Sequence, residues 1–185
     1  MPELQICFHD HCFDGVASAA TFLRFYREKV KPVSDVGFKG LAHRAGQLFG
    51  EDVFAGDENA VVDFRFSADP RLTWWFDHHQ SAFETPADRA AFEQDTSGHK
   101  FWDPAAKSCT RFLARTLQAK AGWDPGPLTE LIDWAELIDG ALFPNPAMAV
   151  QLTEPAMQLM LLIEGATGWP RRSPKVRAPN TRPTC

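Results

Sequence analysis

Apolar runs of strand length alternate with segments of helical period along the first two-thirds of the chain. Runs that end in polar residues predict strands at 4–9, 32–38, 59–66 and 72–79. Small and apolar residues recur at a helical period in 14–30, and 40–50 predicts a shorter helix closed by glycine. Alternating strands and helices predict an α/β fold with a mostly parallel β-sheet flanked by helices.

The pattern becomes helical from Pro86 onward. Helices are expected at 86–94, 104–122 and 126–143, and prolines lie at or near the first helical position. Residues 146–168 predict one more helix, broken or kinked at a proline. The C-terminal part of the fold is therefore expected to be helical.

Composition and charge narrow the class of protein. The 185 residues are 44% hydrophobic and 23% charged, which is typical of a soluble chain long enough for one well-packed domain. The formal net charge of -5 disfavours a broad basic surface for nucleic acid. It is compatible with a small or single-stranded substrate that is held in a local site.

The cysteines and the N-terminus indicate the compartment. The four cysteines are scattered without a CxxC pair, which is typical of reduced thiols in the cytosol. The first ten residues lack the basic start and the apolar core of a signal peptide, and no apolar run is long enough to cross a bilayer. We therefore expect a cytoplasmic protein with no membrane partner.

Residues 169–185 differ in composition from the rest of the chain. They contain four prolines and five lysine or arginine residues but no acidic residue. Such a tail is typical of a disordered end, and the alternatives are a segment that contacts a polyanion or one that replaces a second domain lost by truncation. Composition alone does not separate these three interpretations.

Potential metal ligands gather where the expected strands end. Open α/β sheets bind ligands outside the carboxyl ends of their strands. A cluster of carboxylates and imidazoles at this edge is expected for two divalent cations, and imidazoles favour Mn, Fe or Zn over Mg. The segments at these strand ends would contribute His9, Asp14, Asp63, Asp77, His78 and His79.

Each of these signals also has a purely structural interpretation. An aspartate at a strand end, such as Asp63, more often caps the following turn, and the triplet at 77–79 occurs by chance in many chains. The acidic helix expected at 128–140 has a solvated face by default. Its Asp133 and Asp139 gain a functional interpretation only from the residues that would surround them.

Other histidines and cysteines have simpler interpretations. Cys7, His9 and His11 would share one strand face and form a zinc site, but no second ligand pair at zinc-site spacing follows. His99 is more simply a surface residue of a loop than a phosphate contact. Cys109 has no visible base partner, and together with Ser108 and Thr110 it is best explained by helix packing or capping.

Four segments, in order, resemble the motifs of a known family. FHDHCFDGVASAA, VVDFRF, WWFDHHQSA and LIDWAELIDG are similar to motifs of the DHH phosphoesterase superfamily, which is named for its Asp-His-His triplet. This superfamily includes RecJ-like exonucleases, nanoRNases and cyclic-dinucleotide phosphodiesterases. The resemblance covers residues 3–145. It implies a Mn-dependent hydrolase of phosphodiester or phosphoanhydride bonds, with a parallel-sheet domain followed by a smaller substrate-binding domain.

The resemblance also implies roles for the first two motifs. His9 and Asp14 would be metal ligands, and Gly15 would let the turn pass close to the site. Asp63, from the second motif, would bridge two metal ions, which are expected to be Mn²⁺, with Mg²⁺ or another divalent cation as the alternative.

The third and fourth motifs would complete the site. Asp77 and His78 would be metal ligands or hydrogen-bond partners of ligands, and His79 would bind metal or touch the scissile phosphate. Asp77 and His79 are thus the candidate catalytic residues. Asp139 is the expected fourth-motif ligand, with Asp133 as the fallback six residues earlier.

The chain departs from the family pattern in two places. Many members have two acids around one residue in the first motif, whereas here Cys12 stands two residues before Asp14. Asp10 or Cys12 must fill this position or leave it empty, so one metal position is expected to be weaker or softer. The second departure is that no counterpart of the glycine-rich, phosphate-binding C-terminal domain is recognisable after residue 145.

This organisation predicts a catalytic domain at 1–145, a helical connector at 146–168 and a basic tail at 169–185. The favoured hypothesis is a two-metal phosphoesterase that acts on a short oligonucleotide or a small nucleotide. One alternative is a truncated module that binds metal or nucleotide without turnover, and another is a pyrophosphatase-like enzyme acting on phosphoanhydrides. The sequence is compatible with a homodimer.

Overall fold

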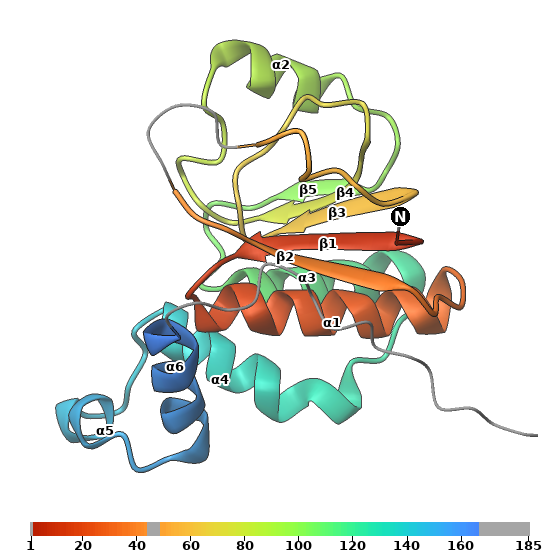
Figure 1. The fold of residues 1–185 in the computed structure, drawn as a ribbon. Coiled ribbons are helices and arrows are strands. Elements are labelled where there is room, and N and C mark those ends of the chain that lie inside the picture. The colour runs from red at the N-terminus through yellow and green to blue at the C-terminus, as the bar shows by residue number, and fades with distance from the viewer. Residues whose placement is uncertain (1, 44–48, 167–185) are drawn as a thin grey trace, which may run out of the picture.

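A parallel β-sheet lies at the centre of the fold (Figure 1). The computed structural model describes residues 2–43 and 49–166, so the tail expected at 169–185 lies outside the described residues. Every pair of neighbouring strands in the sheet is parallel, which confirms the predicted α/β class. The strands are β1 (Leu4–His9), β2 (Val36–Leu41), β3 (Glu58–Val62), β4 (Leu72–Asp77) and β5 (Lys100–Trp102).

The strand order β2-β1-β3-β4-β5 places the first strand inside the sheet. After β1 the chain adds β2 on one side, and it then crosses over to add β3 on the other side. The carboxyl ends of β1 and β3 therefore lie side by side where the direction of winding reverses, and open α/β sheets bind their ligands at such a point. This topology brings His9, at the end of β1, beside Asp63, which follows β3.

Both faces of the sheet are covered, so its central strands are apolar almost throughout. In β4, Trp74 and Phe76 pack on the face covered by α1 (Phe13–Lys29) and α3 (Cys109–Ala121), with α4 (Thr129–Asp139) packed beneath those helices (Figure 1). Trp75 points to the opposite face, as the two-residue period of a strand requires, and packs there with Phe64 and Phe66.

Local capping decides where two helices begin. At α2 (Pro86–Glu93), Thr85 and Asp88 form a reciprocal capping box. At α3, the Ser108 hydroxyl accepts a hydrogen bond from the N–H of Arg111 at 3.1 Å. This helix starts later than the predicted segment 104–122, because Asp103 accepts bonds from the next residues and closes a turn before Ser108.

Three strands differ from the sequence prediction. The strand predicted at 59–66 is β3, which ends at Val62 because Asp63 has a left-handed φ of 56°. β2 runs through Gly40 to Leu41, so the helix predicted at 40–50 does not begin at Gly40, and residues 44–48 of that prediction lie outside the described residues. β5 was not predicted, because three residues are too few to show a strand period. Its pairing with β4 defines it.

The C-terminal segment differs as well. Residues 146–168 were expected as one broken or kinked helix, and the described part of this range, 146–166, contains two, α5 (Pro146–Gln151) and α6 (Pro155–Gly165). Leu152 ends α5 with a left-handed φ of 53°, and Pro155 then starts α6. A short 3-10 turn, η1 (Gly126–Leu128), precedes α4. None of the helices in the described ranges is long and apolar enough to cross a membrane.

Candidate metal centre

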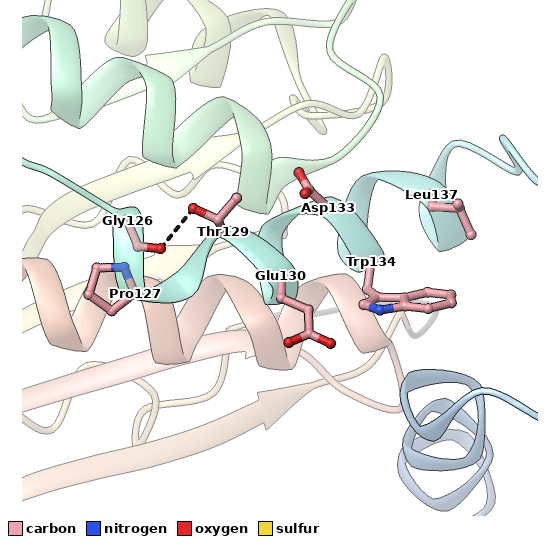
Figure 2. Close-up of a pocket in the computed structure, with 7 residues that line it drawn as sticks. All are labelled: Gly126, Pro127, Thr129, Glu130, Asp133, Trp134 and Leu137. Carbon is pink, nitrogen blue, oxygen red and sulfur yellow. Dashed lines mark hydrogen bonds between the residues drawn. The ribbon is translucent and has the colours of Figure 1, made fainter.

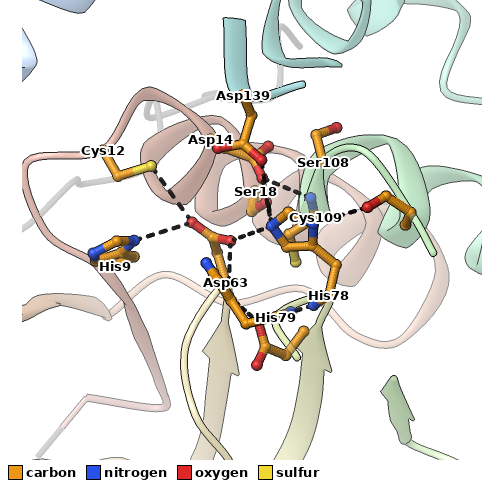
Figure 3. A network of polar contacts seen from close by, with 12 residues as sticks. His9, Cys12, Asp14, Ser18, Asp63, His78, His79, Ser108, Cys109 and Asp139 are labelled. Carbon is orange, nitrogen blue, oxygen red and sulfur yellow. Dashed lines mark hydrogen bonds and ion pairs between the residues drawn. The ribbon is translucent and has the colours of Figure 1, made fainter. Parts of the chain in front are cut away.

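The polar side chains expected at the strand ends lie together at one edge of the sheet (Figure 3). Strands β1, β3 and β4 contribute at or just after their last residues, α1 contributes from its first turn, and α4 contributes from its last residue. In this order, the residues are His9, Asp63, Asp77, His78, His79, Asp14 and Asp139.

Three groups of potential metal ligands overlap in this cluster. Within each group, one ligand atom from every residue lies within 4.8 Å of the others. Asp63 and His78 each belong to two groups. The Asp63 carboxylate could bridge neighbouring cations, as carboxylates do in two-metal sites, whereas the single lone pair of His78 Nε2 could bind only one of them. The groups are His9, Cys12 and Asp63; Asp63, His78 and His79; and Asp14, His78 and Asp139.

Asp63 is the central carboxylate. It is 1% exposed, and its Oδ1 has no hydrogen-bond partner in the described part of the chain, which leaves a buried acceptor for a cation. Its φ of 56° ends β3 in a conformation that is uncommon outside glycine and that clusters at functional sites. Burial acts to raise the pKa of Asp63, but the nearby His78 and His9 rings outweigh it and lower the pKa.

His78 has the orientation of a metal-binding histidine. Its Nδ1 lies 3.2 Å from the carbonyl oxygen of Ala106, and a ligand histidine commonly donates its second N–H in this way. Its Nε2 is buried without a hydrogen-bond partner among the described residues. This atom lies 3.4 Å from Asp63 Oδ1, 3.4 Å from Asp139 Oδ2 and 3.8 Å from Asp14 Oδ2.

The charge of His78 responds to these carboxylates. Burial lowers the pKa of its imidazole, but Asp63, the carbonyl of Ala106 and Asp14 together more than offset this effect and raise the pKa to about 9. Without a cation, a proton therefore supplies positive charge among the acids. A bound cation would take over this role, since metal ligation requires the neutral imidazole.

The N-terminus of α3 holds Asp14 in place. The N–H of Cys109 donates to Asp14 Oδ2 at 2.6 Å, and the N–H of Thr110 donates to Oδ1 at 3.0 Å. These are amides of the first helical turn, which have no partner within the helix. Burial and the carboxylates of Asp63 and Asp139 still raise the pKa of Asp14 well above its usual value, so this group of acids favours a compensating cation.

Asp77 holds His78 and His79 in place through hydrogen bonds. Its buried Oδ1 accepts a hydrogen bond from His79 Nδ1 at 2.7 Å and from the backbone N–H of His78 at 2.9 Å. Within the described ranges, Asp77 belongs to none of the three ligand groups. The bond to Asp77 is the largest reason why the pKa of His79 is raised, and a neutral His79 that donates from Nδ1 keeps the Nε2 lone pair available.

Asp139 reaches the cluster, and Asp133 does not. Asp133 forms an ion pair with Arg111, whereas Asp139 Oδ2 lies 3.4 Å from His78 Nε2. Six residues at 3.6 per turn place the two side chains on different faces of α4. Burial, followed by the charge of Asp63, raises the pKa of Asp139.

A separate groove of about 500 Å³ runs along η1 and α4 (Figure 2). Asp133 contributes to its wall, and no residue of the three ligand groups does. The groove is therefore distinct from the cluster at the sheet edge. Its lining residues are Gly126, Pro127, Thr129, Glu130, Asp133, Trp134 and Leu137.

Cys12, rather than Asp10, lies beside Asp63 in the cluster. Its Sγ lies 3.6 Å from Asp63 Oδ2. Asp10 instead accepts the N–H of His11 at 3.0 Å, and its carboxylate lies so close to Gly40 that a Cβ there would be 2.4 Å from Asp10 Cγ. Burial and the charge of Asp63 raise the pKa of Cys12, so without a cation its thiol is protonated.

The zinc site considered for Cys7, His9 and His11 does not form. The Sγ of Cys7 is buried in the core and donates to the carbonyl of Val53 at 3.4 Å. β1 ends at His9, and the left-handed φ of 54° at His11 turns the chain out of the strand. His11 is half exposed and lies beside Asp10.

His43 is a neighbour of the cluster that the sequence prediction missed. Its ring stacks on Phe64, with centroids 4.7 Å apart, and lies 4.9 Å from the ring of His9. It follows the end of β2, at the same sheet edge as the other candidates. The prediction placed it inside a helix, so the rule about strand ends was not applied to it. His99, by contrast, is in none of the three ligand groups, and its ring stacks on the ring of Trp74 with centroids 3.8 Å apart.

Gly15 allows α1 to start close to His9. A Cβ at this position would lie 2.2 Å from the carbonyl oxygen of His9, which is a severe clash with backbone. We expect Gly15→Ala to displace the start of α1, and with it Asp14, and to weaken Mn²⁺ binding measured by calorimetry. Gly165→Ala is the matched control, because nothing lies within 4 Å of a Cβ there. Equal Mn²⁺ affinity in both variants would contradict this role for Gly15.

No protein-family model matches the chain, and the search of curated proteins found no match. The chain is therefore described by its fold and by the geometry of its site. The chain is an α/β protein whose parallel sheet has a candidate two-cation site at its carboxyl edge, where the winding of the strands reverses.

Proposed function

We propose that the chain is a metal-dependent phosphoesterase of the DHH superfamily that hydrolyses phosphodiester bonds in short oligonucleotides or small nucleotides. The observation that supports this most is the overlap of three ligand groups at Asp63 and His78. Both residues have a buried polar atom without a hydrogen-bond partner in the described part of the chain. Two divalent cations, with Mn²⁺ as the expected metal, would satisfy both atoms.

In such a centre, bound cations lower the pKa of a water molecule, orient the phosphate and neutralise charge in the transition state. The protein's part is to hold its ligands rigidly. Asp14 is fixed by the amides of α3, His78 by Ala106 and His79 by Asp77. Each ligand thus starts in place, and little reorganisation is needed when the substrate binds.

The open side of the cluster suits a phosphate group. His79 is 32% exposed and His9 is 25% exposed, and the exposed His43 lies beside His9. On this exposed side, a ring nitrogen that binds neither a cation nor Asp77 can donate a hydrogen bond to a phosphate oxygen. The net charge of -5 supports a small substrate over a long polyanion, since a polymer would meet unfavourable charge beyond the site.

The direct test is hydrolysis of an aryl phosphodiester in the presence of Mn²⁺. We expect the activity to require Mn²⁺ and to fall to background in His78→Asn, which removes the buried Nε2 from between the carboxylates. His99→Asn is the matched control, because His99 is a half-buried histidine that stacks on Trp74 outside the ligand groups. Activity that is the same in both variants would overturn the proposal.

Parallel assays separate the two alternatives. Inorganic pyrophosphate and a short oligonucleotide would be offered to the same preparation. Faster hydrolysis of pyrophosphate would identify a phosphoanhydride hydrolase. Calorimetric nucleotide binding without Mn²⁺-dependent hydrolysis of any of these substrates would identify a binding module instead.

A further inference from the structure

The two halves of the cluster differ in the chemistry of their ligand atoms. Next to Asp63, one half offers the sulfur of Cys12 and the imidazole of His9, and each lies 3.6 Å from Asp63 Oδ2. The other half offers the carboxylates of Asp14 and Asp139 around His78. One position is therefore rich in soft and borderline ligands, and the other is rich in oxygen.

Three observations indicate that the Cys12 side is a ligand site. Asp63 is 1% exposed, and its Oδ2 faces both Cys12 Sγ and His9 Nδ1 at 3.6 Å, while its Oδ1 faces His78. His9 Nδ1 is buried and lacks a hydrogen-bond partner within the described ranges. Cys12 occupies the N-cap position of α1, and its thiol donates to Asp63 Oδ2 in the cluster.

We propose that this centre is mixed, with a thiolate-ligated position at His9, Cys12 and Asp63 for Zn²⁺, Fe²⁺ or Co²⁺, and a Mn²⁺ position at Asp14, His78 and Asp139. Thiolate and imidazole bind these cations more tightly than Mn²⁺, which stands at the weak end of the divalent series and prefers oxygen. The inference rests on the proposed two-cation function. It adds that the two positions select different metals.

Cobalt titration of the protein tests the sulfur ligand directly. We expect Co²⁺ to produce an intense near-ultraviolet band from thiolate-to-metal charge transfer, and we expect Cys12→Ser to lose it. Cys7→Ser is the matched control, since a serine hydroxyl can donate to the same carbonyl of Val53. X-ray absorption of the zinc-loaded wild-type protein should show a Zn–S distance of about 2.3 Å, and this measurement does not depend on any variant.

Metal competition tests the selectivity. The chain is equilibrated with Mn²⁺ in large excess over Zn²⁺, both above the protein concentration, because zinc binds more tightly than manganese at most sites. It is then passed over a desalting column, and bound metal is measured by mass spectrometry. We expect the wild type to retain both metals, with zinc at the thiolate position. In Cys12→Asp the ratio of Zn to Mn should fall about tenfold or more, because an oxygen ligand replaces the thiolate.

The outcomes distinguish this inference from the proposed function. Cobalt binding without a sulfur band, together with Mn²⁺-dependent hydrolysis, would overturn the mixed centre and leave the phosphoesterase standing. A sulfur band that depends on Cys12 in a protein without hydrolysis would support the thiolate position and overturn the enzyme. Failure to bind Co²⁺, Zn²⁺ or Mn²⁺ would overturn both.

Discussion

Asp63→Asn is expected to abolish the stabilisation that Mn²⁺ gives to the folded chain. Asp63 belongs to two of the three ligand groups, and its buried carboxylate lies within 3.6 Å of both His9 and His78. A ligand present at one hundred times its dissociation constant stabilises the native state by about 2.7 kcal/mol, which corresponds to a rise in Tm of about 5–10 °C for a chain of this size. The near-isosteric asparagine retains the shape but removes the charge.

The measurement compares Tm with and without Mn²⁺ in each variant. A change in stability that the substitution causes without metal affects both values, so it drops out of the difference. Asp133→Asn is the matched control, because Asp133 is exposed, pairs with Arg111 and lies outside the ligand groups. It should keep the full metal-dependent rise. A rise of equal size in Asp63→Asn would show that the cation binds elsewhere, and the assignment of the cluster as a metal centre would fail.

Trp75→Ala is expected to cause the largest loss of stability. Trp75 is fully buried in β4, its ring centroid lies 5.0 Å from that of Phe66 and 5.2 Å from that of Phe92, and its Nε1–H donates to the carbonyl of Phe64 at 2.9 Å. Truncation of such a ring costs about 3–5 kcal/mol, against a total of about 5–15 kcal/mol for a typical domain. Phe64 follows Asp63, so the loss also loosens the metal cluster.

Equilibrium unfolding in urea measures this effect. Trp75→Phe keeps a ring but leaves the Phe64 carbonyl without its donor. We expect the lost hydrogen bond to lower the free energy of unfolding by about 1–3 kcal/mol, in addition to the effect of the smaller ring. The total should stay below that of Trp75→Ala. Trp134→Ala removes a half-buried ring from the groove on α4 and should cost less than Trp75→Ala. Equal losses at positions 75 and 134 would contradict the view that β4 is the rigid support of the site.

Much of the fold follows from local pattern. β1 ends at His9, as its apolar run predicts, because a strand buried on both faces must be apolar along its length. Asp63 follows β3, and the triplet at 77–79 begins at the last residue of β4, so the rule that ligands collect at the carboxyl edge locates them from sequence. β5 and the continuation of β2 to Leu41 were not predicted. Both depend on pairing with a neighbouring strand, and this pairing leaves no clear pattern in their own residues.

The sequence by itself determined which chemistry is available, since strand ends that carry Asp, His and Cys indicate a cation site. Only the tertiary structure decided how these groups meet. Cys109 donates to Asp14 across 95 residues, Cys12 rather than Asp10 faces Asp63, and His43 joins from β2. The reason is that residue type and period are local properties, whereas the contacts of a buried polar atom depend on elements that only the packed sheet and helices bring together.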